Sequence, residues 1–113
     1  MSADLIHGAL DMLILEVLSK GRGYGYQIAQ AVLSESGDRL EIKEGSLYPA
    51  LHRLERKKWV QSEWGESPEG RRRKYYTLTG TGAAARREKR DRWTDFAKGV
   101  SGVLGQDLRE VAS

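Results

Sequence analysis

The carboxy-terminal third of the sequence carries a helical pattern that is too long for a chain of this size to cover by itself. Thr79 is a good N-cap and no proline follows it, so the pattern predicts a helix from Gly80 or Thr81 to near Leu108. At about 1.5 Å per residue such a helix spans roughly 40 Å. A compact domain of about 100 residues has a radius of gyration of only about 13 Å. The helix is therefore expected to extend beyond its own domain and to need a partner surface.

The apolar residues of this segment recur at near-heptad spacing, which favours packing against a second copy of the chain. A homodimer is the simplest arrangement, and a hydrophobic fraction of 39% agrees with a core that a partner completes. Gly99, Gly102 and Gly105 would either kink or end the helix or allow close helix approach, and the sequence leaves these alternatives open. The predicted dimerisation residues are Leu10, Ile14, Trp93, Phe96, Val100, Val103, Leu104 and Leu108.

Upstream of this segment the apolar spacing predicts three shorter helices and then a hairpin. The helices are expected at about 6–18 and 24–36, and from a cap at Gly45 or Ser46 to about 58, with an extended piece at 40–42. Two β-type runs, 60–64 and 73–78, flank a turn-rich loop at 65–72. This order predicts a mainly α (α+β) fold, a winged helix-turn-helix with a long C-terminal dimerisation helix. Residues 1–79 are expected to form a DNA-binding domain and residues 80–113 the dimerisation helix.

The net charge of +3 is distributed unevenly along the chain. Residues 71–92 hold nine Lys and Arg against two Asp and Glu, whereas the segments on either side are slightly acidic. A local basic block favours a polyanion as partner, most commonly nucleic acid, and the alternative is a solvated charged face. No apolar run approaches the ~18–20 residues of a membrane span and no secretory pattern is present, which predicts a cytoplasmic protein without a membrane partner.

The sequence offers none of the patterns typical of an enzyme or a metal site. It contains no Cys, which excludes disulfides, thiolate zinc sites and cysteine nucleophiles. The glycine-rich segment 21–25 lacks the spacing of a nucleotide-binding loop, and the two His residues lie in different predicted helices without a third ligand. We therefore expect no catalytic residues, no metal and no cofactor.

Several segments together resemble the PadR family of bacterial transcriptional regulators. They occur in the family's order over about residues 8–82, and the recognition-helix and wing strings are specific in combination. The C-terminal part is similar to the subgroup with a single long terminal helix. The segments are Leu13-Ile14-Leu15, Gly23-Tyr24-Gly25-Tyr26-Gln27-Ile28, Glu44-Gly45-Ser46-Leu47-Tyr48-Pro49-Ala50-Leu51-His52-Arg53-Leu54-Glu55, Ser62-Glu63-Trp64, and Arg72-Arg73-Lys74-Tyr75-Tyr76-Thr77-Leu78-Thr79 with Gly82.

The resemblance implies a winged-helix homodimer that binds a palindromic DNA operator and is usually a repressor. It also implies that some members lose DNA affinity when a small effector binds near the dimer interface. The motifs do not encode the identity of such an effector.

Two sets of residues are expected to contact double-stranded DNA. An α-helix fits the major groove, so the polar face of the third helix is the expected reader, with Arg53 suited to bidentate pairing with guanine. The wing, residues 65–74, carries concentrated positive charge that would bind phosphates and make binding strongly salt-dependent. The alternatives are a solvated helix face and a solubilising hairpin tip. The candidate DNA-binding residues are Ser46, Tyr48, Pro49, His52, Arg53, Arg56, Arg71, Arg72 and Lys74.

Trp93 and Phe96 lie one turn apart on the terminal helix and are candidates for effector binding. In a symmetric dimer, two such pairs would form an aromatic slot able to hold a small aromatic or hydrophobic effector. Ordinary dimer packing is the alternative for both residues.

Two functions from other classes compete with a transcriptional regulator. A winged-helix protein-interaction module would have the same fold and no operator, so it would show no sequence preference in a selection from random DNA. A small-ligand-binding dimer without operator binding would show ligand quenching of Trp93 and no effect on DNA.

Overall fold

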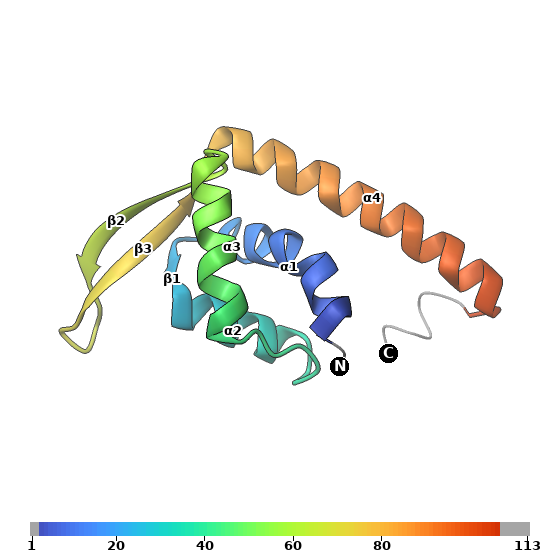
Figure 1. Cartoon of the computed structure of the whole chain (residues 1–113), viewed down its shortest axis with the longest axis horizontal. Coiled ribbons are helices and arrows are strands. Elements are labelled where there is room, and N and C mark those ends of the chain that lie inside the picture. Colours follow the sequence, from blue (N-terminus) through green and yellow to red (C-terminus); the bar gives the residue numbers. More distant parts are fainter. Residues whose placement is uncertain (1–2, 107–113) are drawn as a thin grey trace.

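A computed structural model describes residues 3–106, with side chains described for residues 9–106. Its elements confirm a mostly helical winged helix-turn-helix followed by one long helix (Figure 1). The molecule is elongated, with extents of 50 × 28 × 23 Å, because the last helix projects away from the body. The elements are α1 (Ala3–Leu18), β1 (Gly23–Tyr24), α2 (Gly25–Glu35), α3 (Glu44–Arg56), β2 (Val60–Glu66), β3 (Arg72–Leu78) and α4 (Gly80–Leu104).

A single apolar core joins the first three helices to the base of the hairpin. Burial of these side chains is the main favourable term in folding, since it removes apolar surface from water. The sheet contributes Val60 and Tyr76, and Ala85 of α4 packs against the edge of the core. The fully buried large side chains are Leu10, Ile14, Leu15, Ile28, Leu47, Leu51, Leu54 and Val60.

The three-stranded antiparallel sheet has the order β1-β3-β2. The two residues of β1 pair with Tyr75 and Tyr76 of β3, which places this short strand at the sheet edge. The expected extended piece at 40–42 takes no part in the sheet and is a loop that buries Ile42.

Helix α3 begins earlier than its proline suggested. Lys43 is the N-cap and the helix starts at Glu44, so the expected cap at Gly45 or Ser46 was wrong. Pro49 therefore lies in the second turn, where it removes the hydrogen bond to the carbonyl of Gly45. Because Gly45 is exposed, that carbonyl can be solvated and the helix tolerates the proline.

Helix α4 begins as predicted and ends at Leu104, four residues before the expected end near Leu108. The Thr79 hydroxyl caps it by accepting from the Gly82 N–H at 3.0 Å and donates to the Lys58 carbonyl at 2.6 Å. Gly105 adopts the left-handed conformation at φ 73° and ends the helix, whereas Gly99 and Gly102 remain helical. Leu108 lies outside the described residues.

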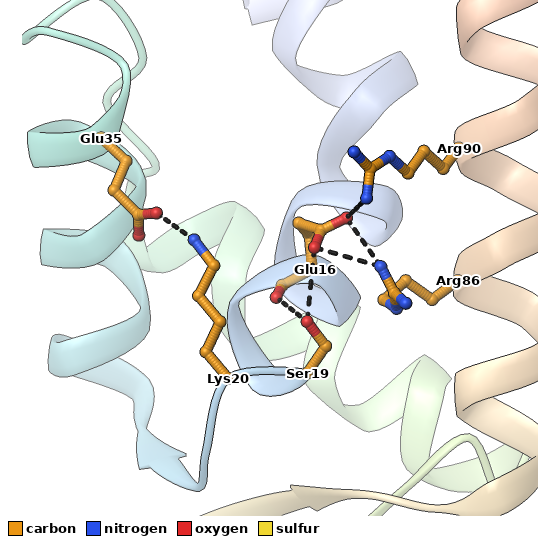
Figure 2. Close-up of polar contacts among 6 residues, drawn as sticks. All are labelled: Glu16, Ser19, Lys20, Glu35, Arg86 and Arg90. Atoms are coloured by element: carbon orange, nitrogen blue, oxygen red, sulfur yellow. Dashed lines mark hydrogen bonds and ion pairs between the residues drawn. The ribbon is translucent and has the colours of Figure 1, made fainter.

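One acidic residue of α1 pairs with two arginines of α4, which packs against α1 (Figure 2). The Arg86 guanidinium donates to both carboxylate oxygens of Glu16 at 3.1 and 3.2 Å, and Arg90 lies 3.8 Å from the same carboxylate. In the turn that follows α1, Lys20 pairs with Glu35 of α2. These contacts join α1 to α4 and the turn after α1 to α2. Within residues 3–106, no helix combines the length and apolarity needed to cross a membrane.

Candidate nucleic-acid interface

Helix α3 presents three distinct faces. Successive residues are about 100° apart around a helix, and the buried face is formed by Leu47, Ala50, Leu51 and Leu54. Pro49, His52 and Arg56 lie on the opposite, outer face. The two flanks lie between these faces, one toward the wing and one toward α1. The predicted DNA-binding residues of this helix are therefore divided among three surroundings.

The outer face is free of intramolecular polar contacts among the described residues. Pro49, His52 and Arg56 are all exposed, and no hydrogen bond or ion pair within residues 9–106 involves the His52 or Arg56 side chain. Ser46, at the start of the α1-side flank, is also exposed. These residues can meet the base edges or phosphates of a major groove without breaking a contact in the protein.

Tyr48 lies on the wing-side flank and reaches across to the first turn of α2. A Cβ built on Gly25 would lie 2.6 Å from the Tyr48 hydroxyl oxygen, so only glycine allows the ring to rest there. The ring remains partly exposed. Its position joins α2 and α3, the two helices of the helix-turn-helix, and leaves one edge available to a ligand.

Arg53 does not join the outer face. Its Nη2 donates to Oδ1 of Asp11 on α1 at 2.7 Å, and both side chains are partly buried. A charge-assisted hydrogen bond of this length is among the stronger polar contacts in proteins. The candidate for bidentate guanine recognition is thus engaged inside the protein, where it connects α3 to α1.

The wing cations also differ in their surroundings. Arg71 and Arg72 are exposed near the hairpin tip, whereas Lys74 lies 3.8 Å from Glu55 of α3. Arg73 points to the other face of the sheet, with its guanidinium 5.0 Å from the Tyr24 ring. Arg71 and Arg72 are therefore the wing cations best placed for a polyanion.

Two ionisable groups near the wing have shifted pKa values. Burial raises the pKa of the Tyr76 phenol, and Glu55 and Tyr48 raise it further. Hydrogen bonds from its own backbone N–H and from the Ser67 hydroxyl hold the pKa of Glu69 below its ordinary value. At neutral pH the first stays uncharged and the second adds one negative charge to the hairpin loop.

The basic start of α4 is used mainly within the protein. Arg86 and Arg90 contact Glu16, and Arg92 contacts Glu88 one turn earlier at 2.6 Å. Nζ of Lys89 lies 5.4 Å from the centroid of the Trp59 ring, and Nζ of Lys57 lies 4.5 Å from the same centroid. Within the basic block 71–92, Arg71 and Arg72 of the wing therefore have no ion-pair partner among the described residues, whereas Arg86 and Arg90 of α4 pair with Glu16 of α1.

An apolar stripe remains exposed on the second half of α4. The predicted dimerisation residues Trp93, Phe96, Val100, Val103 and Leu104 are all exposed, and Val103 reaches 88%. Leu10 and Ile14 are 1% and 0% exposed. They belong to the core of a single chain, so including them in a dimer surface was wrong.

A cavity of about 540 Å³ lies between α1 and α4. Trp93 and Phe96 form part of its wall, with their ring centroids 6.1 Å apart. The cavity combines aromatic surface with three cations and one carboxylate, the Asp11 that holds Arg53. The lining residues are Ala9, Asp11, Met12, Arg53, Lys89, Arg92, Trp93 and Phe96.

Two exposed aromatic residues escaped the sequence prediction. Tyr26, in the first turn of α2, is 63% exposed, and Trp64 of β2 is 59% exposed. Both lie in segments that resemble the family, but an aromatic residue in a short amphipathic element is ordinarily read as core. Only the strand register and the helix start reveal that these two side chains point outward.

Comparisons with known proteins agree with this architecture. The model of the transcriptional regulator PadR-like family matches residues 14–88. An uncharacterized protein from Lysinibacillus sphaericus is 34% identical over 93 residues, which are 82% of this chain and 85% of that protein. A transcriptional regulator from Clostridium thermocellum is 33% identical with a TM-score of 0.79, over 88% of this chain and 97% of that chain. A PadR-like transcriptional regulator from Bacillus cereus is 27% identical with a TM-score of 0.79, over 93% and 100% of the two chains.

The different surroundings of two arginines on α3 predict different effects of their removal. Arg53→Ala should lower the free energy of unfolding by roughly 0.5–1 kcal/mol, because it breaks a partly buried ion pair. Arg56→Ala, the matched control one turn further along, should leave stability unchanged. Urea unfolding followed by circular dichroism measures both, and a cycle with Asp11→Asn isolates the pair. Equal stability of the two arginine variants would contradict the role given to Arg53.

Proposed function

Because the chain belongs to the PadR-like family of transcriptional regulators, which are DNA-binding proteins rather than enzymes, we propose that it is a repressor that binds a palindromic operator as a homodimer. The observation that carries this proposal is the outer face of α3, exposed and free of internal polar contacts, beside a wing with two exposed arginines. Residues 1–79 supply the DNA-binding part and residues 80–113 the dimerisation part.

In this proposal α3 enters the major groove while the wing contacts the adjacent backbone. Ser46, Tyr48, Pro49, His52 and Arg56 would face the groove, where hydroxyl, imidazole and guanidinium groups can bind base edges and phosphates. Pro49 offers a rigid apolar surface for a thymine methyl. Arg53 supports this surface from behind by holding α3 on α1 through Asp11.

Arg71, Arg72 and Lys74 would neutralise phosphates. Such contacts add affinity for any sequence and position the recognition helix without selecting the bases. Lys74 can reach the backbone only by leaving Glu55, so we expect the two exposed arginines to contribute most.

The dimer is proposed from the exposed stripe on α4. Isolated exposed apolar residues are normal, but a continuous stripe of five large ones on a single helix is typical of an interaction surface. A two-fold axis near this stripe would place the two α3 helices symmetrically, which matches a palindromic site.

The cavity beside Trp93 and Phe96 supports a second, regulatory part of the proposal. Its volume lies within the usual range for small-molecule sites, and its wall is part aromatic and part cationic. We propose that a small aromatic or hydrophobic effector binds there and releases the protein from DNA. Arg53 links the cavity wall to the recognition helix and offers a physical route for that effect.

Measuring operator affinity in variants distinguishes contacts that select bases from contacts that bind phosphates. Tyr48→Ala should weaken operator binding by about tenfold or more, since it removes a ring placed beside the reading face. Arg71→Ala with Arg72→Ala should weaken binding to every duplex and flatten the plot of log affinity against log salt by about 3.6, because a dimer carries four of these arginines and each phosphate contact contributes about 0.9. Fluorescence anisotropy with an operator selected from random DNA measures both effects, with dimer mass as the control. A failure to select any sequence would instead favour a protein-interaction module.

Dimerisation should depend on the stripe rather than on α4 as a whole. Val103→Asp places a charge in the proposed interface and should shift the protein toward the mass of one chain. Thr94→Asp, which adds the same charge on the other side of α4, is the matched control and should leave the mass unchanged. Sedimentation equilibrium distinguishes the results, and a wild-type monomer at micromolar concentration would contradict the proposed homodimer.

The cavity should bind an aromatic anion used as a probe. We expect 8-anilinonaphthalene sulfonate to become fluorescent with the folded protein and to lose at least about half of that signal in Trp93→Ala. Trp64→Ala, which changes a tryptophan far from the cavity, should retain the signal. If the probe binds but operator affinity at saturating probe is unchanged, the cavity does not control DNA binding and the regulatory part of the proposal is wrong. Probe binding by a protein that binds no operator would instead favour the ligand-binding dimer.

A further inference from the structure

Trp64 combines high exposure with a contact to a wing arginine. Its indole is 59% exposed in β2, and the guanidinium carbon of Arg72 lies 4.9 Å from the ring centroid. The two residues come from neighbouring strands, since β2 pairs with β3 in antiparallel register. Tryptophan side chains are usually largely buried, whereas this one is exposed and contacts one of the two exposed wing arginines.

The strand register shows which way the pair points. Directly paired residues of an antiparallel sheet lie on the same face. Trp64 pairs with Lys74, and two residues further along Glu66 pairs with Arg72, so Trp64, Lys74 and Arg72 share one face. The near end of that face carries the buried Val60 and Tyr76. The outer end therefore continues the sheet surface that covers the core.

Contacts with α3 place this face beside the recognition helix. Ser62 donates to Glu55 of α3 at 2.5 Å, and Lys74 lies 3.8 Å from the same residue. Figure 1 shows the β2–β3 hairpin projecting from the helical body beside α3. Trp64 and Arg72 thus lie on the α3 side of the wing, where bound DNA would run.

The two neighbouring arginines make a natural comparison. Arg73 belongs to the opposite face of the sheet, where its guanidinium lies against Tyr24. Arg71 precedes β3 and has no aromatic partner among the contacts of residues 9–106. Trp64 is therefore the aromatic partner of Arg72 in particular, and neither of the neighbouring arginines shares it.

We propose that Trp64 is a positioning residue that holds Arg72 on the α3 side of the wing for contact with a DNA phosphate. A free arginine side chain loses rotamer freedom when it binds, whereas one already stacked on an aromatic ring loses less. A shallow hollow of about 370 Å³ lined by Trp64, Gly65, Glu66, Gly70 and Arg72 leaves room for the backbone of the nucleic acid. This inference rests on the proposed function, because it assigns the wing to DNA.

The experiment compares Trp64→Ala, Trp64→Phe, Arg72→Ala and the double variant Trp64→Ala/Arg72→Ala in the full chain. We expect Trp64→Ala to weaken binding to the operator and to random duplex alike, by about three- to fivefold. Trp64→Phe should retain most of the affinity, because a phenyl ring still supports the guanidinium. The double variant should bind no more weakly than Arg72→Ala, since Trp64 acts through Arg72. Arg71→Ala with Trp64→Ala should be additive and serves as the control pair.

A measurement without DNA tests the stacking itself. The ring current of Trp64 should shift the Arg72 side-chain protons in the NMR spectrum of the free protein, and Trp64→Ala should abolish that shift. Unchanged affinity in Trp64→Ala, or additive losses in the double variant with Arg72→Ala, would overturn the positioning role. Absence of DNA binding by the wild-type protein would instead overturn the proposed function, while the NMR result would still report on the pair.

Discussion

The contact in which Nη1 of Arg86 donates to both carboxylate oxygens of Glu16 connects α4 to α1 and so to the rest of the protein. Glu16 lies on α1, the helix that also contacts α2 and α3, so α1 is the common support for the reading helix and the terminal helix. Five residues earlier on α1, Asp11 holds Arg53 of α3. Two carboxylates on one helix thus each hold an arginine from a different helix. Because α3 and α4 both pack on α1, the position of α4 relative to α3 is set by contacts within the folded chain rather than by a linker.

The same contacts explain why a count of basic residues overstates the surface available to DNA. Arg53, Arg86 and Arg90 are all engaged by acidic residues of α1, whereas Arg56, Arg71 and Arg72 have no such partner among the described residues. The first group contributes to the shape of the protein, and the second remains available for phosphates and bases. Net charge describes long-range attraction to a polyanion, but the location of individual carboxylates decides which cations can make contact.

The sequence predicted the order of elements well because each helix carries a regular apolar spacing and Thr79 is an unambiguous cap. It missed β1, since two residues are too short for any periodic pattern, and it placed the start of α3 too late because Pro49 occupies the second turn. The errors in the site have one physical origin. Apolar spacing marks Leu10 and Ile14 as buried without showing whether they pack on the same chain or on another. The polarity of Arg53 suggests an exposed side chain, but Arg53 pairs with Asp11, which lies 42 residues away in the sequence. Contacts between distant residues decide both cases.

The contacts of α4 also change along its length, at the place where the charge of the sequence changes. Up to Arg92 the helix packs on its own chain: Ala85 lies against the core and Arg86 pairs with Glu16. Gly82 lies so close to the chain at Trp59 that a Cβ at this position would be 1.9 Å from the Trp59 carbonyl oxygen. From Trp93 onward its large apolar side chains are exposed. The expected domain boundary after residue 79 coincides with the end of the wing. The first half of α4, however, packs on the winged helix-turn-helix and is structurally part of it.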